Sequence, residues 1–153
     1  MVFGGRRESR FSRGRARRYV LDANALIGLF EDREGTADKI EHLLEQALRQ
    51  DLPLLMSAVN WGEVFYIAWR RRGEAKAREA EGRLQEMPVA VISLDQERAS
   101  RAGALKRRHS LDYADAYAAE LAIERGAWLV TADREFSKVG KTLSVYSLPR
   151  HEK

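Results

Sequence analysis

The sequence contains no cysteine among its 153 residues, and only three histidines and three prolines. Without cysteine the protein forms no disulfide, holds no zinc through thiolates and has no cysteine nucleophile, so a reducing compartment is the simplest expectation. The uncharged stretches are shorter than the roughly 20 apolar residues that a membrane span needs, and no apolar signal segment is recognisable. We therefore expect a cytoplasmic protein with no membrane contact.

The apolar content of 44% is ordinary for a globular protein, and the length suits one domain with its own hydrophobic core. The formal net charge of +4 conceals an uneven distribution. Residues 1–18 contain seven arginines and one glutamate, whereas residues 19–153 carry a net charge of −2. The sequence therefore predicts a mildly acidic domain behind a basic arm, an asymmetry typical of proteins that bind nucleic acid or an acidic partner.

The basic arm, residues 1–18, has no apolar periodicity and is rich in Gly, Ser and Arg, which predicts a disordered segment. Its arginines are candidates for contacts with RNA phosphates: Arg6, Arg7, Arg10, Arg13, Arg15, Arg17 and Arg18. The alternative is an extension without function, and length and charge alone do not choose between the two. Residues 149–153 are expected to form a short tail.

Short apolar runs alternate with amphipathic segments from residue 19 to residue 148. Four strands and a candidate fifth are expected near residues 19–22, 54–56, 89–92, 128–131 and 143–146. Helices are expected between them, and the clearest covers residues 36–50, where apolar residues recur at helical spacing. This alternation predicts a single-domain, three-layer α/β/α fold with a parallel sheet of four to five strands.

Two of the expected strands end at an acidic residue: the first runs into Asp22, and Thr131-Ala132-Asp133 closes the fourth. Because parallel strands end at the same edge of a sheet, where open α/β sheets bind ligands, the two carboxylates are expected to lie on one edge. Asp22 could instead cap the next helix, although Asn24 is an equally good cap, and Asp133 could be an ordinary turn residue. The equivalent positions of the two acids favour a functional site.

Two more acids lie in otherwise apolar helical surroundings. In Asn60-Trp61-Gly62-Glu63 the acid fits a helix capping box, but the apolar residues around Glu63 argue for a partner or a metal. Asp115 is expected one turn into an alanine-rich helix that Asp112 begins, where the helix dipole favours a carboxylate. We interpret Glu63 and Asp115 as site residues and Asp112 as a helix cap.

Four carboxylates on one edge of a sheet would repel one another and bind protons unless a cation neutralised them. With no cysteine and no convergent histidine, the ligands are all oxygen, which selects Mg²⁺ or Mn²⁺ before Zn²⁺. Such an ion orients a phosphate, activates water and neutralises charge on the leaving oxygen, which is the chemistry of phosphodiester hydrolysis. The residues thus predict a divalent-metal site made by Asp22, Glu63, Asp115 and Asp133.

At these residues the sequence resembles a known family. The shared pattern is a strand followed by Asp22-x-Asn24, then Ser57-x-x-Asn60-x-x-Glu63, Asp115-Ala116 and Thr131-x-Asp133-x-x-Phe136. Over residues 19–148 it is similar to the PIN domain, and within that family to the VapC-type toxins of bacterial and archaeal toxin–antitoxin pairs. Two features depart from the family: Ser or Thr usually stands where Asn60 does, and the arginine-rich arm has no place in the pattern.

The resemblance implies a PIN-like sheet with the first strand at its centre and a Mg²⁺- or Mn²⁺-dependent endoribonuclease that a small antitoxin protein blocks. It implies that the catalytic and metal-binding residues are Asp22, Glu63, Asp115 and Asp133, and that Asn24 and Thr131 support the site. Three aromatic residues recur at helical spacing, a pattern that indicates either a core-facing stripe or a homodimer face. They are Trp61, Phe65 and Trp69.

Two other functions stay open. A non-catalytic module could keep this fold and bind RNA or protein, although the complete set of four acids speaks against it. A haloacid-dehalogenase-like phosphotransferase would use Asp22 as its nucleophile, but that family needs a second aspartate where Asn24 stands.

Overall fold

Five strands form one parallel sheet in the computed structural model, which describes residues 16–150. They are β1 (Tyr19–Leu21), β2 (Leu54–Ser57), β3 (Val89–Ile92), β4 (Trp128–Thr131) and β5 (Ser144–Ser147). Their order is β3-β2-β1-β4-β5, and every neighbouring pair is parallel. The predicted parallel sheet is confirmed, β1 lies at its centre, and the candidate fifth strand is part of it.

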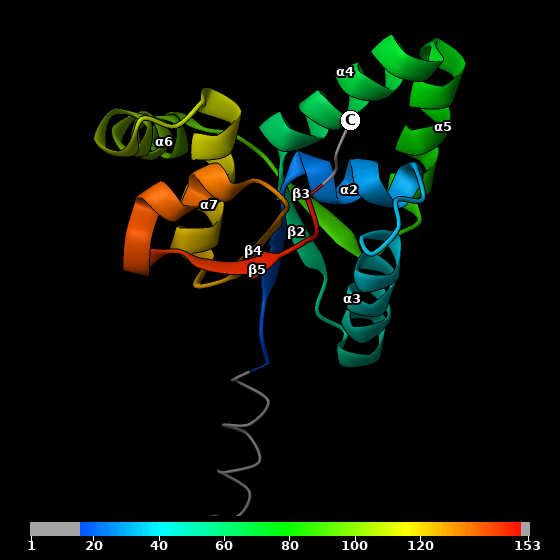
Figure 1. Cartoon of the computed structure of the whole chain (residues 1–153), viewed down its shortest axis with the longest axis horizontal. Helices are drawn as coiled ribbons and strands as arrows, with labels where there is room; N and C mark the ends of the chain where they lie inside the picture. The colour runs from blue at the N-terminus through cyan, green and yellow to red at the C-terminus, as the bar shows by residue number, and fades with distance from the viewer. Residues whose placement is uncertain (1–15, 151–153) are drawn as a thin grey trace, which may run out of the picture.

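The helices cover both faces of the sheet, which confirms the three-layer architecture. They are α2 (Ala23–Phe30), α3 (Ala37–Gln50), α4 (Ala58–Arg72), α5 (Glu74–Gln85), α6 (Gln96–His109), α7 (Tyr113–Arg125) and the 3-10 segment η1 (Arg134–Thr142). Figure 1 shows α6, α7 and η1 on one side of the sheet and α3 and α5 on the other.

Side chains of the central strands alternate between two hydrophobic cores. Leu21 and Val130 point into the core that α2 and α3 cover, whereas Val20 and Leu129 point into the core beneath α6 and α7. All four are fully buried. Because covered parallel strands are apolar on both faces, they appear in the sequence as short continuous hydrophobic runs, and this is why their positions could be predicted.

Most of the basic arm lies outside the described residues. The predicted RNA contacts of its first five arginines therefore stay predictions: Arg6, Arg7, Arg10, Arg13 and Arg15. Arg17 and Arg18 are described, and both contact the sheet. The Arg17 guanidinium carbon lies 4.1 Å from the centroid of the Trp128 ring, and the Arg18 carbonyl accepts a hydrogen bond from the Trp128 N–H at 2.9 Å. These contacts extend the pairing of β1 with β4 backwards, so the last two arginines of the predicted arm belong to the folded domain.

The aromatic stripe lies along α4. The Trp61 and Phe65 ring centroids are 6.2 Å apart, and those of Phe65 and Trp69 are 5.9 Å apart. Trp61 packs against the core, whereas Trp69 is 43% exposed. The stripe therefore runs from core to surface, and the homodimer stays a prediction.

None of the helices over residues 16–150 has the length and apolar character needed to cross a membrane.

Candidate functional site

The predicted acidic edge lies where the strand order changes direction. The chain passes from β1 to β2 and β3 on one side and then returns to β4 on the other side of β1. Such a switch point separates the connecting helices at the carboxyl ends of two adjacent strands, and open α/β sheets bind ligands there. Leu21 pairs with Val130, and the Asp22 N–H donates to the Val130 carbonyl at 3.0 Å. Asp22 is thereby held at this switch point, at the carboxyl edge of the sheet.

Asp22 is only 3% exposed, and both of its carboxylate oxygens accept hydrogen bonds. Oδ1 accepts from the Ala23 N–H at 2.8 Å, and Oδ2 accepts from the Thr131 hydroxyl at 2.7 Å and the Asn24 amide at 3.0 Å. Asp22 is therefore the N-cap of α2, and the expectation that Asn24 caps this helix is wrong. The reason is that the extended backbone of β1 continues through Asp22 (φ −76°, ψ 162°), so the helix begins at Ala23.

Asn24 and Thr131 join the ends of β1 and β4. The Asn24 Oδ1 accepts from the Ala132 N–H at 3.0 Å, and the Asn24 amide also donates to the Thr131 hydroxyl oxygen at 3.3 Å. Thr131 Oγ1 accepts a further bond from the Asp133 N–H at 2.9 Å. With its bond to Asp22, the hydroxyl uses its one donor and two acceptor sites, which fixes its orientation. Both side chains predicted to support the site thus contact Asp22.

Asp133 follows β4 and begins η1. Its Oδ1 accepts from the Glu135 N–H at 2.9 Å, so the residue does cap a turn, as the simpler interpretation expected. This bond uses one of the two carboxylate oxygens of Asp133 and leaves the other for a second contact. A capping role and a site role are therefore compatible at Asp133, as they are at Asp22.

Glu63 lies in the second turn of α4, because this helix begins at Ala58 rather than at Asn60. Ser57 is the N-cap, and its hydroxyl accepts from the Val59 N–H at 3.2 Å. The alternative of a capping box between Asn60 and Glu63 is therefore wrong, and the interpretation of Glu63 as a site residue does not compete with a capping role. The extended backbone of β2 ends at Ser57 (φ −68°, ψ 142°), three residues earlier than the sequence pattern indicated.

Asn60 is fully buried and ties α4 to α7. Its Nδ2 donates to the carbonyl of Ala114 at 3.1 Å, directly before Asp115. Its Oδ1 is buried and has no hydrogen-bond partner among the described residues. A buried carbonyl oxygen without a donor is unusual in a folded protein and is typical of a position where water or an ion is bound.

The acids influence one another electrostatically. Burial, reinforced by repulsion from Asp22, Asp133, Asp112 and Glu63, raises the pKa of Asp115 to about 8. Burial raises the pKa of Asp22 to about 6, with smaller contributions from Glu63 and Asp133. Burial also raises the pKa of Glu63, and Asp112 adds to the shift. The structure thus brings the four predicted acids into one negatively charged cluster and adds Asp112, whose side chain makes no capping bond to α7.

Within residues 16–150, no group of three or more Asp, Glu or His side chains has the spacing needed to hold a metal ion. The chemistry of the cluster still fits a hard divalent cation. Its donors are all oxygen and its charge is negative. Asn60, whose Oδ1 has no partner among the described residues, is bonded to the Ala114 carbonyl next to Asp115. A cation would also relieve the repulsion that raises the carboxyl pKa values.

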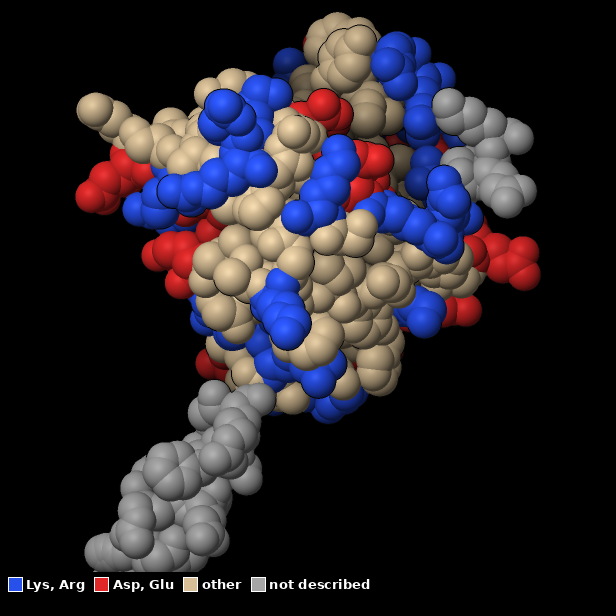
Figure 2. Space-filling view, turned by 60° about the vertical axis from the view of Figure 1, so that its left-hand side comes forward, with Lys and Arg blue, Asp and Glu red and all other residues tan. Residues whose placement is uncertain are grey.

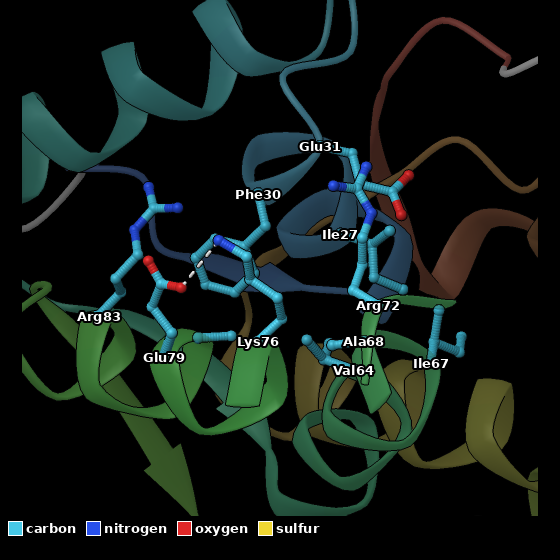
Figure 3. Close-up of a pocket in the computed structure, with 11 residues that line it drawn as sticks. Ile27, Phe30, Glu31, Val64, Ile67, Ala68, Arg72, Lys76, Glu79 and Arg83 are labelled. Carbon is cyan, nitrogen blue, oxygen red and sulfur yellow. Dashed lines mark hydrogen bonds and ion pairs between the residues drawn. The ribbon is translucent and has the colours of Figure 1, made fainter. Parts of the chain in front are cut away.

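A separate cavity of about 140 Å³ lies between α2, α4 and α5, and none of the four acids lines it. Figure 3 shows Phe30 together with Lys76, Glu79 and Arg83 at one end and Glu31 and Arg72 at the other. The remaining lining is apolar and comprises Ile27, Val64, Ile67, Ala68 and Ala80. Sequence analysis missed this groove, because its residues come from three helices and carry no shared local pattern.

The comparisons with known proteins agree on one fold. The family described as "PIN domain" matches residues 19–142. VapBC2 from Rickettsia felis, bound to a DNA fragment from its promoter, is similar with a TM-score of 0.67 and 15% identity, over 85% of this chain and 98% of that chain. A toxin–antitoxin complex from Klebsiella pneumoniae is similar with a TM-score of 0.57 and 24% identity, over 82% of this chain and 98% of that chain.

A third similar structure is VapC20 from Mycobacterium tuberculosis, described as a sarcin–ricin loop cleaving toxin. Its TM-score is 0.61 at 19% identity, over 80% of this chain and 95% of that chain. At these identities the solved structures establish the likeness of fold. A comparison with curated proteins finds no match.

Proposed function

Because the chain belongs to the PIN domain family, we propose that the acidic cluster is the active site of a divalent-metal-dependent endoribonuclease. The observation that carries this proposal is the convergence of Asp22, Glu63, Asp115 and Asp133 from four segments of the chain. In residues 16–150 no lysine or arginine forms an ion pair with any of the four. Clustered carboxylates that lack a cationic partner are costly unless a bound cation balances them.

The four carboxylates would hold Mg²⁺ or Mn²⁺, and the bound ion would orient the scissile phosphate, activate a water molecule and neutralise charge on the leaving oxygen. Asp22 is preorganised for this role, because its bonds with Ala23, Asn24 and Thr131 fix its carboxylate before any substrate arrives. Asn60 keeps α4 against the start of α7, and so sets the distance between the segments that carry Glu63 and Asp115.

Incubation with a mixture of structured RNAs tests the proposal. The wild-type protein should cleave RNA in Mg²⁺ or Mn²⁺ and lose all cleavage in EDTA. Asp22→Asn, Glu63→Gln, Asp115→Asn and Asp133→Asn should each reduce the rate by about 100-fold or more, because each removes a carboxylate from the metal site.

Asp112→Asn is the matched control for this experiment. Asp112 is an exposed acid in the same cluster, and its side chain makes no capping bond, so the variant should keep most of the activity. Cleavage that persists in EDTA would exclude the metal mechanism. A chain that binds RNA but never cleaves it would favour the alternative of a non-catalytic binding module.

We also propose that the protein is the toxin of a toxin–antitoxin pair, acting in the cytoplasm where it meets RNA and its antitoxin. One of the similar structures is described as a toxin–antitoxin complex, and another is described as a toxin. The groove between α2, α4 and α5 offers an apolar floor with charges at both ends, which suits an amphipathic segment of a small partner. Val64 lines this groove and follows Glu63 directly, so a bound segment would lie close to the acidic cluster.

An aspartate on the groove floor should release the antitoxin. With a purified antitoxin that inhibits cleavage, Ile67→Asp should weaken inhibition about 10- to 100-fold, because the complex would bury an unpaired carboxylate. Leu48→Asp is the control, since Leu48 is 68% exposed on α3 and does not line the groove. Equal inhibition of the two variants would place the antitoxin elsewhere, and both should cleave RNA normally when the antitoxin is absent.

A further inference from the structure

Two lysines from different elements converge on the loop between α6 and α7. Lys106 of α6 donates to the Leu111 carbonyl at 3.0 Å, and Lys138 of η1 donates to the Ser110 carbonyl at 3.2 Å. The carbonyls belong to consecutive residues, so the two ammonium groups are held close to one short segment. This segment leads directly into Asp112 of the acidic cluster.

Tyr113 is the first residue of α7 and is 55% exposed. Its ring stacks on Tyr117 with centroids 5.8 Å apart and an angle of 23° between the planes. The Lys106 Nζ lies 5.5 Å from the Tyr113 ring centroid. On the α6 side, a Cβ added at Gly103 would lie 3.8 Å from the Tyr113 hydroxyl, so the ring rests over this helix. Tyr113 is thus an aromatic side chain held by its neighbours and still half open to solvent.

Charge at this segment is mixed, with cations beside the acidic cluster. Pairing with Glu135 raises the pKa of Lys138, and the nearby Asp112 and Asp133 add to the shift, which places this lysine within the field of the site acids. Figure 2 shows lysine and arginine side chains interspersed with acidic side chains over the face that it presents. Lys138 lies near the site acids and would attract an RNA backbone that approaches the acidic cluster.

We propose that Lys106, Tyr113 and Lys138 form a subsite for an unpaired RNA nucleotide that neighbours the nucleotide cleaved at the acidic cluster. The inference rests on the proposed ribonuclease function. Each lysine has three donors. Lys106 gives one to the Leu111 carbonyl and keeps two, whereas Lys138 gives one to the Ser110 carbonyl and one to Glu135 and keeps one for a phosphate. The Tyr113 ring supplies the stacking surface for a base, as aromatic side chains do in proteins that bind single strands.

The subsite defines a class of substrate. Bases in an A-form duplex are already stacked and paired, whereas those in loops and bulges are free to stack on a protein ring. The enzyme is therefore expected to cleave within single-stranded segments of RNA and to respond to the presence of a base at the position next to the cut.

The test measures RNA binding to the full-length Asp22→Asn protein in Mn²⁺, so that the RNA stays intact. Fluorescence anisotropy with a short unstructured RNA should show that a further Tyr113→Leu change weakens binding about 5- to 150-fold, the loss expected for one stacked base. Tyr113→Phe keeps the ring and should bind as the parent does. Trp69→Leu removes another exposed aromatic side chain, on α4, and should also leave binding unchanged.

RNAs that carry a single abasic nucleotide provide a second measurement that leaves the protein unaltered. When the base that stacks on Tyr113 is the missing one, the parent protein should bind the abasic RNA more weakly than the intact RNA, by the same factor as the Tyr113→Leu change. The Tyr113→Leu protein should bind that abasic RNA and the intact RNA equally well, because it has no ring for the base to contact. Lys106→Gln and Lys138→Gln should each flatten the dependence of log affinity on log salt by roughly 0.7 per phosphate contact. If Tyr113→Leu binds as the parent and abasic effects are equal in both proteins, the subsite is wrong.

Cleavage by the otherwise wild-type protein separates this inference from the proposed function. If the protein cleaves RNA in Mn²⁺ but no abasic position depends on Tyr113, the subsite is overturned and the ribonuclease stands. If one abasic position depends on Tyr113 in the binding measurement but no RNA is cleaved, the ribonuclease is overturned and a nucleotide subsite on an RNA-binding protein remains.

Discussion

Replacing Asp115 with asparagine is expected to raise the melting temperature of the metal-free protein and to remove most of the further rise that Mn²⁺ produces in the wild type. Burial and repulsion from the neighbouring acids raise the pKa of Asp115 to about 8, so at neutral pH the folded state must either hold an unfavourable charge or take up a proton that the unfolded chain releases. The amide has nearly the same shape and no charge, and it relieves the repulsion. It is also a poorer ligand for a hard cation.

The size of the metal response follows from mass action. A site filled to about 100 times its dissociation constant stabilises the fold by about 2.7 kcal/mol. For a domain of this size that corresponds to a rise of about 5–10 °C in the wild type. Thermal melts with and without millimolar Mn²⁺ measure both effects. A variant that melts lower than the wild type but keeps the full response would make Asp115 a structural residue and not a ligand.

The same carboxyl gives the metal-free protein a pH-dependent stability. An acid whose pKa is raised on folding, from 3.8 to about 8 at Asp115, binds its proton more tightly in the folded state than in the unfolded state. The contribution of this carboxyl to the free energy of unfolding is complete below pH 3.8 and is lost as the pH rises through about 8. Asp22, with a pKa raised to about 6, acts in the same direction. Urea midpoints should therefore fall across this range, less steeply in Asp115→Asn than in the wild type.

The strands and the acidic edge were predictable because their physical causes are local in the sequence. A strand covered on both faces must be apolar throughout, so β1 and β4 are recognisable from a few residues. Parallel pairing then carries whatever follows such a strand to the same edge, which is how Asp22 and Asp133 could be linked across the chain. Glu63 and Asp115, the two acids that helices supply, were predicted from their otherwise apolar helical surroundings, and the family resemblance pointed to the same two residues.

The helix starts and the inner contacts of the site were not predictable in the same way. Whether Asp22 or Asn24 caps α2 depends on how far the extended backbone of the strand continues, and both residue types suit the position. The bond from Asn60 to Ala114 joins residues 54 apart, and no local pattern encodes it. The site therefore emerges from the sequence as a set of acids with two supporting side chains, Asn24 and Thr131, whereas the contact by which Asn60 holds α4 against α7 emerges only from the fold.

The largest loss of stability outside the site is expected from Glu120→Ala. Glu120 lies in α7 and is 2% exposed, and its carboxylate accepts two bonds from the Arg98 guanidinium at 3.0 and 3.1 Å and one from Arg101 at 2.8 Å. Breaking a buried ion pair by removing one partner costs about 3–5 kcal/mol, because the other charge stays buried. Arg98 is 9% exposed and keeps a contact with Glu124 at 3.3 Å, so we expect the lower end of this range.

Glu124→Ala is the matched control, one turn further along α7. Its side chain is 38% exposed and pairs with Arg98 and Arg125, and exposed pairs of this kind contribute about 1 kcal/mol or less. Urea denaturation of the two variants should therefore separate them by about 2 kcal/mol. Equal losses would show that the Arg98–Glu120 pair behaves as if it were solvated.

The physical reason can be tested with a double variant, Arg98→Met with Glu120→Leu. If the loss in Glu120→Ala comes from an uncompensated buried charge, replacing both partners by apolar side chains of similar size should recover most of the stability. Arg101 would lose its partner as well, but its side chain is 45% exposed and its guanidinium can turn into water. A double variant as unstable as Glu120→Ala would contradict this explanation and indicate that the geometry of the ion pair itself holds α6 against α7.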